Sequence, residues 1–292
     1  MQIDPLKLCF RILKVILVSI TAVLLTYSVV FSIAGTILIY KGYQLAVTPI
    51  KKVQLLKDSN PEESLFMSRY RQQLSTQGLS DSLFQIFIPL DSISPHLKNA
   101  VIAAEDDGFY THPGVDLEAI AQASEYNKSQ GQFKRGASTL TQQVAKNFFL
   151  GGEKSFKRKA KELCFALLME HYLGKERILE LYLNYAQWGK NIFGCEAASQ
   201  HYFKKSASEL NRNEAARLAA VLAMPSKLTP FHKTNFMGKR LAVIANNLYM
   251  HKQIDDQGFF GLTGSLPPRK DTLQINNKEK EKVVPVENRT SF

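Results

Sequence analysis

Acidic and basic side chains in three short segments have the types and spacing to carry chemistry. The first segment, EDDGFYTHPG, begins at Glu105 and follows the apolar run of residues 100–104. A carboxylate held partly in apolar surroundings has a raised pKa and can transfer protons near neutral pH. The alternative is that these acids cap a helix or lie solvated in a loop, which is the commoner fate of acidic side chains.

The second segment, GASTLTQQVAKN, covers residues 136–147. Thr139 and Gln142 have capping-box spacing, so we expect a helix to begin here with free backbone N–H groups that favour an anion. Thr139, Gln142 and Lys146 would share one face, opposite an apolar stripe that includes Leu140 and Val144. A phosphate-holding face fits this pattern, and an ordinary solvated face fits it equally well.

The third segment is KRKAKE, residues 157–162. On a helix, Arg158 and Lys159 lie one turn from Glu162. Two cations around one carboxylate could hold a diphosphate. A surface salt-bridge network is the simpler interpretation of this segment alone, because charge runs are usually solvated.

Other common catalytic signatures are absent from the sequence. It contains no G-x-x-x-x-G-K-[ST], H-E-x-x-H, G-x-S-x-G or CxxC motif, and its six histidines are scattered, which argues against a zinc site. Three cysteines exclude a disulfide-stapled scaffold. Cys164 lies in an apolar helical run and is expected in the core, while a bridge between Cys164 and Cys195 stays open.

The elements that must position these segments are mostly helical. Capping-box spacing recurs at Ser206 with Glu209 and at Asn211 with Glu214. Residues 84–90 alternate apolar side chains and indicate a short extended segment, whereas the polar stretch 125–135 is expected to form a flap over the site. Apolar periodicity predicts helices near residues 65–73, 96–105, 139–150, 156–173, 175–185, 196–203, 211–224 and 237–251.

The N-terminal region predicts one membrane anchor. Residues 15–40 contain no charged side chain and are long enough to span a bilayer. Lys7, Arg11 and Lys14 precede this run against one acid, Asp4, which favours a cytoplasmic N-terminus. A cleaved signal peptide and a buried helix of a soluble core are the alternatives; the run is long for the former and unusually free of charge for the latter.

Charge and composition divide the remaining chain. We expect a cytoplasmic segment 1–14, a transmembrane helix 15–40, a membrane-proximal connector 41–84, a mostly α domain 85–260 and a disordered polar tail 261–292. Residues 1–14 and 269–292 each carry a net charge of +2, which leaves +7 of the total +11 on residues 41–268. A basic exported domain is attracted to anionic lipid headgroups or an anionic substrate, and nucleic acid is not an expected partner outside the cytoplasm.

Five segments in one order carry a resemblance that covers about residues 88–250. They are EDDGFYTHPG, GASTLTQQVAKN, RKAKE, RILELYLNYAQWGKNIFG and EAARLAAVLAMP. Together they resemble the family 51 peptidoglycan glycosyltransferases, of the monofunctional, membrane-anchored biosynthetic transglycosylase type. The resemblance implies a lysozyme-like, two-lobed domain facing the periplasm from the inner membrane. It also implies polymerisation of lipid II into β-1,4-linked glycan strands with inversion, in which lipid II and the growing strand are the substrates.

The resemblance further implies residue roles. Glu105 would be the general base, and Glu162 a second essential carboxylate near the donor diphosphate. Lys146, Arg158 and Lys159 would neutralise that leaving group. The substrate-binding positions that it implies are Ser138, Thr139, Gln142, Gln143, Asp106, Phe109, His112 and Gly114, the last three as residues that shape the first segment. A fourth, mainly structural motif would comprise Arg177, Glu180, Tyr182, Asn184 and Gly189.

No cofactor is implied as a requirement, although Mg²⁺ or Mn²⁺ could assist the diphosphate. The lipid bilayer is an implied partner, and transpeptidases are expected to supply cross-linking because no S-x-x-K or K-T-G motif is present. A glycan-cleaving lysozyme-like enzyme and a non-enzymatic anchored scaffold remain the alternatives. The first would not need the three cations, and intact Glu105 and Glu162 argue against the second.

Overall fold

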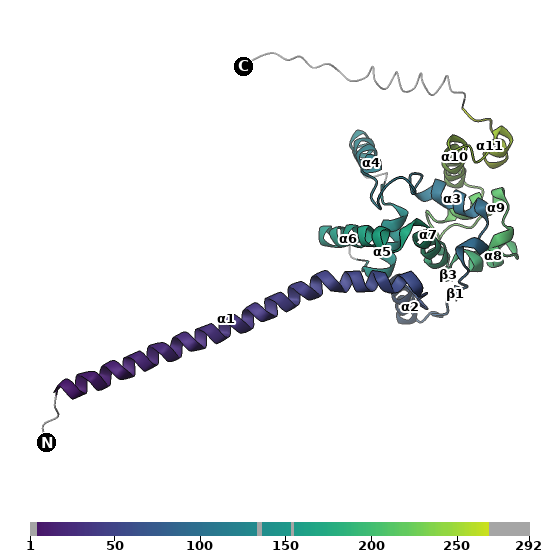
Figure 1. Ribbon diagram of the computed structural model, residues 1–292. Helices are drawn as coiled ribbons and strands as arrows, with labels where there is room; N and C mark the ends of the chain where they lie inside the picture. Colours follow the sequence, from purple (N-terminus) through teal and green to yellow (C-terminus); the bar gives the residue numbers. More distant parts are fainter. Residues whose placement is uncertain (1–4, 133–135, 153–154, 269–292) are drawn as a thin grey trace, which may run out of the picture. The chain divides into compact units, whose positions relative to one another are not determined.

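The computed structural model describes residues 5–132, 136–152 and 155–268 (Figure 1). The expected tail lies outside the described residues from residue 269 onward, as do residues 133–135 of the expected flap. The chain divides into two compact units, residues 1–55 and 56–292, which are described separately below.

In the N-terminal unit the structure describes one long helix, α1, which runs Pro5–Asp58 and whose last three residues belong to the second unit. It contains the predicted span 15–40, where almost every side chain is exposed, and it is long and apolar enough to cross a membrane. Several hydroxyl groups in this span donate to backbone carbonyls one turn earlier, as Ser32 Oγ does to the Ser28 carbonyl at 2.8 Å, which satisfies those donors within the helix. The helix therefore fits a single-pass anchor. It also continues through Pro49, where the sequence had indicated a polar connector from residue 41.

The second unit is mostly α-helical, as the sequence predicts. Serine, threonine, asparagine or aspartate side chains cap many of the helix starts, and all three predicted capping boxes are present. Its α-helices are α2 Leu65–Thr76, α3 Pro95–Glu105, α4 Leu117–Ser129, α5 Leu140–Phe149, α6 Phe156–Tyr172, α7 Gly174–Tyr185, α8 Cys195–Phe203, α9 Arg212–Val221, α10 Asn235–Met250 and α11 Asp256–Thr263.

Three short strands form a small sheet beside the helices. β1 (Phe84–Gln85) pairs parallel with β3 (Ile192–Phe193), and β2 (Gln187–Gly189) pairs antiparallel with β3. The predicted extended segment 84–90 is a strand only at its first two residues. The Asn184 side chain, rather than a strand, bonds the Ile88 N–H and carbonyl, and a 3₁₀ turn follows at Leu90–Ser92.

The core is centred on α3 and α7. Helix α3 packs against α9 and α10, and α5 packs against α6 and α7. Trp188, the only tryptophan of the chain, has no exposed surface, and its indole N–H has no hydrogen-bond partner among the described residues. Phe109 and Leu179 are equally enclosed. This packing fixes the ends of α3 and α5, where two of the three chemical segments lie.

Three sequence expectations were wrong in this unit. Cys164 is exposed on α6 and Cys195 is buried, and both are free thiols, so no bridge joins them. Helix α4 occupies Leu117–Ser129 where the first part of a flap was expected, with Asp116 capping its start. Helix α11 continues to Thr263, beyond residue 260.

Candidate active site

Glu105 is the last residue of α3 and is only 15% exposed at its side chain. Its Oε1 lies 2.8 Å from Nη2 of Arg240 on α10, and its Oε2 accepts a hydrogen bond from Nε2 of Gln143 on α5 at 3.1 Å. Burial raises the pKa of the Glu105 carboxyl, and the Arg240 guanidinium opposes that shift most strongly. A carboxylate with these properties can act as a general base.

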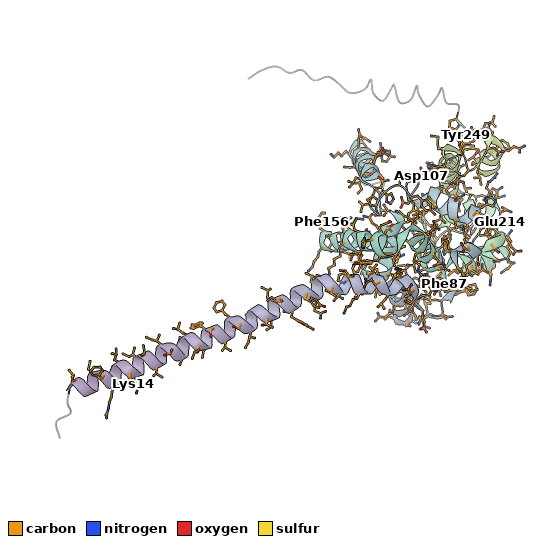
Figure 2. All side chains as sticks on the ribbon, viewed as in Figure 1. Lys14, Phe87, Asp107, Phe156, Glu214 and Tyr249 are labelled. Carbon is orange, nitrogen blue, oxygen red and sulfur yellow. The ribbon has the colours of Figure 1, made fainter. Side chains whose placement is uncertain are left out.

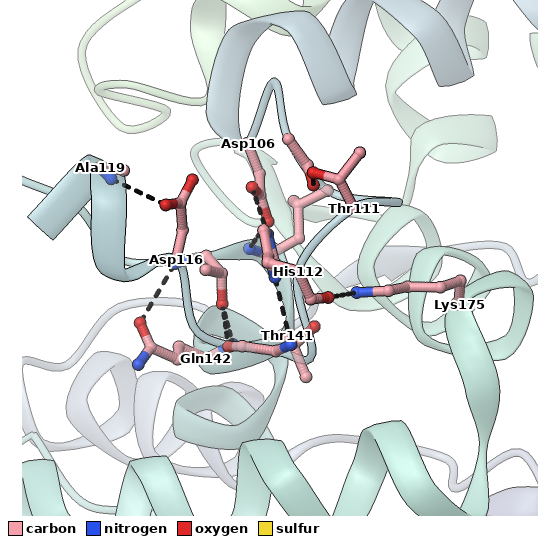
Figure 3. A network of polar contacts seen from close by, with 12 residues as sticks. Asp106, Thr111, His112, Asp116, Ala119, Thr141, Gln142 and Lys175 are labelled. Atoms are coloured by element: carbon pink, nitrogen blue, oxygen red, sulfur yellow. Dashed lines mark hydrogen bonds and ion pairs between the residues drawn. The ribbon is translucent and has the colours of Figure 1, made fainter.

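Asp106 joins the first segment to the start of α5. One of its oxygens lies 2.8 Å from His112 Nε2, and the other accepts from the Leu140 backbone N–H at 2.8 Å (Figure 3). Because His112 Nδ1 accepts from the Gly114 N–H, the proton of the neutral imidazole is on Nε2 and points at Asp106. The side chains of Asp106 and His112 therefore use their hydrogen bonds to hold this loop in place.

A second set of contacts, made by Lys175 of α7, stabilises the same loop. Lys175 donates to the His112 carbonyl at 2.7 Å (Figure 3). It also donates to Glu170 at 2.8 Å, and its ammonium lies 4.6 Å from the Phe109 ring centroid. Gly114 has φ +88°, and an added Cβ would lie 2.7 Å from Glu170 Cγ. Glycine is therefore required at this position.

Thr139 and Gln142 are buried rather than solvated, which excludes the solvated-face interpretation for these two residues. Thr139 Oγ1 donates to the Gly114 carbonyl at 2.7 Å and also accepts from the Gln142 N–H as the N-cap of α5. Ser138 and Lys146 stay exposed at the two ends of this region.

Glu162 anchors a cluster of cations on α6. It is 3% exposed, and its two oxygens lie 2.8 Å from Arg158 Nη1 and 2.5 Å from Lys159 Nζ. Lys159 also donates to Ser138 Oγ at 3.1 Å, which links α6 to the residues before α5. The Arg158 Nε is buried without a hydrogen-bond partner among the described residues, so this guanidinium keeps a donor unused.

Lys146 connects the two carboxylate sites electrostatically. The pKa of Lys146 is lowered, first because the surrounding groove limits its hydration and then because Arg158 and Lys159 repel it, while Glu162 and Glu105 oppose the shift. Its side chain nevertheless keeps contact with solvent. A cation in this position is available to an incoming anion.

The predicted fourth motif braces the fold behind the site. Asn184 donates to the Ile88 carbonyl and accepts from the Ile88 N–H, both at 2.9 Å, and Glu180 accepts from the Leu90 N–H. Arg177 pairs with Glu180 and donates to backbone carbonyls before α2. The remaining members are equally enclosed: Tyr182 donates to Gln143 at 3.4 Å, and a Cβ on Gly189 would lie 2.5 Å from the Tyr202 hydroxyl.

A cavity of about 800 Å³ opens directly at Glu105. Its walls come from α3, the loop that follows it, the start of α4, the residues before α5, and α10. Ser138 and Thr139 line it beside Glu105, and Arg240, Val243 and Asn247 form the α10 wall. The cavity can therefore admit a substrate group to the carboxylate.

The described residues contain no group of three or more His, Cys, Asp or Glu side chains that could hold a metal ion. The carboxylates of the site are already engaged, because Glu162 is paired with two cations and Asp106 with His112 and a backbone N–H. Among the residues that the structure describes, these paired carboxylates do not form a metal cage.

The structure brings the predicted residues together from α3, α5 and α6 and adds one that the sequence reasoning missed. Arg240 contacts Glu105 although 135 positions separate them, and its segment carries no motif that singles it out. Arg240 and Asn247 lie two turns apart on one face of α10, and that spacing was the signal available in the sequence.

A helical domain with an accessible buried carboxylate beside a cation cluster has the site expected of a glycosyltransferase that acts on phosphate-activated sugars. The "Transglycosylase" family model matches residues 72–249, so the chain belongs to that family.

Similar proteins agree with this family assignment. A protein of Bordetella pertussis named "Biosynthetic peptidoglycan transglycosylase" is 44% identical over 195 residues, covering 65% of this chain and 81% of its own. Proteins of the same name from Ralstonia nicotianae and Nitrosospira multiformis are 48% and 42% identical, covering 57% and 65% of this chain and 71% and 82% of theirs. The crystal structure of penicillin-binding protein 1A from Haemophilus influenzae aligns at 19% identity over 68% of this chain and 21% of that one, with a TM-score of 0.36.

Proposed function

We propose that this protein is a membrane-anchored peptidoglycan glycosyltransferase that polymerises lipid II. Glu105 takes the proton from the 4-hydroxyl of the N-acetylglucosamine of incoming lipid II. The hydroxyl oxygen attacks C1 of the donor strand's terminal N-acetylmuramic acid as the bond from C1 to the diphosphate oxygen breaks. The undecaprenyl diphosphate leaves with the bonding electron pair, and the α linkage becomes β.

One observation carries the proposal. The Glu105 carboxylate lines the cavity, and Lys146 interacts electrostatically both with Glu105 and with Glu162 of the cation cluster. Burial raises the pKa of the Glu105 carboxyl and so makes it a stronger base, and the Arg240 guanidinium opposes that rise. Lys146, Arg158 and Lys159 would meet the charge of the departing diphosphate, and the exposure of Lys146 beside the other two cations supports that role. Glu162 holds two of these cations in place.

The neighbouring polar residues have positioning roles in this proposal. Gln143 fixes the second oxygen of Glu105, and Ser138 is held by Lys159 where the cavity meets the cations. Gln142 and Thr139 set the start of α5, while Asp106, His112, Phe109 and Gly114 shape the loop beside Glu105. A lysozyme-like arrangement in two lobes remains a prediction.

Bilayer contact would extend beyond α1. On α6, Phe156 is 97% exposed (Figure 2), and Leu163 and Leu167, which are 38% and 48% exposed, fall on the same side of the helix by their spacing. Three lysines lie between Phe156 and Leu163 in the sequence. Such a face suits an anionic membrane surface. We further propose that the N-terminus is cytoplasmic and that the second unit faces the periplasm, where transpeptidases would cross-link the product. No nucleic acid takes part.

No cofactor is assigned to the chain. If Mg²⁺ or Mn²⁺ assists, the diphosphate itself would be its main ligand, because the carboxylates around the cations are already paired.

The deciding experiment incubates the full chain with labelled lipid II in detergent, with and without a chelator. Glycan polymer is the expected product. Glu105→Gln should lower the rate about 10²- to 10⁴-fold while lipid II binding survives, because only proton transfer is lost. Glu118→Gln, an acid lining the same cavity, is the matched control and should retain activity.

Two outcomes would contradict the proposal. Shortening of added glycan with inert lipid II would identify a lytic enzyme. Full activity of Glu105→Gln would remove Glu105 from the reaction.

A further inference from the structure

The last turn of α3 ends at Glu105 with backbone carbonyls that have no partner inside the helix. The Ile102 carbonyl accepts from the Asp106 N–H, which closes the final helical bond. The next two carbonyls are met from another helix: Asn247 Nδ2 donates to Ala103 O at 2.9 Å, and Arg240 Nη2 donates to Ala104 O at 3.1 Å. Helix α10 therefore caps α3.

These caps matter because Glu105 lies at the helix end. Helix carbonyl ends carry partial negative charge, and last turns fray easily. The chain leaves the helix at once, since Asp106 has φ −161° and ψ 74°. If the two donors of α10 were removed, the backbone of the turn that carries Glu105 would be held mainly by the hydrogen bonds within α3.

Asn247 and Arg240 make different contributions. Arg240 touches the Glu105 carboxylate itself and brings a charge. Asn247 is neutral, lines the same cavity and contacts the backbone two residues before Glu105. Removing its amide would loosen the turn without removing the charge beside Glu105.

We propose that Asn247 is a positioning residue for Glu105: its amide fixes the Ala103 carbonyl and thereby the direction in which the carboxylate enters the cavity. This inference rests on the proposed function. A third contact, between Asp107 and His251 at 3.0 Å, joins α10 to the same loop, but both side chains are too exposed for it to hold the turn strongly.

The test uses paired variants of adjacent asparagines in the full chain. Asn247→Ala removes the amide, and Asn247→Asp keeps its shape but removes the N–H donor. Asn246, which is exposed on the same helix, supplies the controls Asn246→Ala and Asn246→Asp with the same changes in size and charge. Initial rates of polymerisation of labelled lipid II give kcat and KM, and circular dichroism reports the folded state.

We expect both Asn247 variants to lose about 10- to 100-fold in kcat, because a small displacement of a reacting group is costly. KM for lipid II should stay within about twofold, because in this proposal the orientation of the Glu105 carboxylate matters for proton transfer and not for binding of lipid II. The activity of Asn247→Asp relative to Asn246→Asp should recover as the pH falls, because a protonated carboxyl can again donate to Ala103 O.

Wild-type kcat in both Asn247 variants would overturn the inference while leaving the proposed function intact. Failure of both to fold would also overturn it, because Asn247 would then serve the fold as a whole. A wild-type chain that forms no polymer would refute the proposed function itself, before the variants are compared.

Discussion

Two influences of opposite sign act on the Glu105 carboxyl. Burial raises its pKa, and the Arg240 guanidinium lowers it. A general base works best when its pKa is close to the working pH and most of it is ionised. The contact with Arg240 therefore favours the ionised form of Glu105, which is the form that can remove a proton.

Arg240→Gln is expected to shift the acidic limb of the kcat/KM profile to higher pH. The base is active when ionised, so loss of the cation that lowers its pKa moves ionisation upward and reduces activity on the acidic side. Lys239→Gln, an exposed neighbour with the same charge change, is the control. An acidic limb that moves equally in both variants would indicate a general charge effect rather than a contact with Glu105.

Individual residues show where sequence reasoning succeeds and where it does not. Glu105, Lys146 and Glu162 are recognised because each lies in a distinctive local segment. Arg240 is missed because its significance comes entirely from tertiary contact. Cys164 was misplaced because an apolar run identifies a helix but not the side of the helix that the core covers.

At the scale of elements, α3 and α5 meet through the loop between them. The Thr139 hydroxyl caps α5 and also binds Gly114, while Asp106 binds the first N–H of α5. Helix α6 closes the other side of this loop, because a Cβ on Gly114 would lie 2.7 Å from Glu170 Cγ and 3.3 Å from the Ala166 carbonyl oxygen.

Gly114→Ala is expected to destabilise the domain by about 1–3 kcal/mol and to lower activity, through backbone strain and overlap with Glu170. Gly78→Ala is the control, because Gly78 also has positive φ, at +68°, but open space around its Cβ position. Thermal unfolding of the detergent-solubilised proteins measures the difference. Equal losses for the two variants would mean that φ alone, and not the overlap, sets the cost.

Element prediction was reliable where local chemistry marks a boundary. Capping boxes at Thr139, Ser206 and Asn211 predicted their starts correctly, because those bonds form within one turn. Helix α4 was missed because its polar sequence lacks a strong apolar period. The end of α1 was missed because hydropathy marks the limit of a membrane span, and a helix can continue beyond that limit.

For the whole molecule, the proposed orientation predicts which cysteines can be labelled from outside. In a Cys164→Ser chain that also carries Ser265→Cys, an impermeant maleimide should label the new thiol in intact spheroplasts. Cys9 should react only after permeabilisation, because it lies in the basic N-terminal segment. Cys195 should stay silent in both states, because burial raises the pKa of its thiol and closes off access. Labelling of Cys9 in intact spheroplasts would reverse the orientation.

Trp188 gives the molecule an optical property of practical use. As the sole indole, enclosed on every side, it emits as one shielded fluorophore that neither solvent nor a ligand in the Glu105 cavity contacts. We expect the emission of Trp188 to change little when a ligand enters the cavity, because Trp188 does not line it. A second indole introduced by Val243→Trp would be solvent-facing on the cavity wall, so any change in emission on adding lipid II would come from that wall.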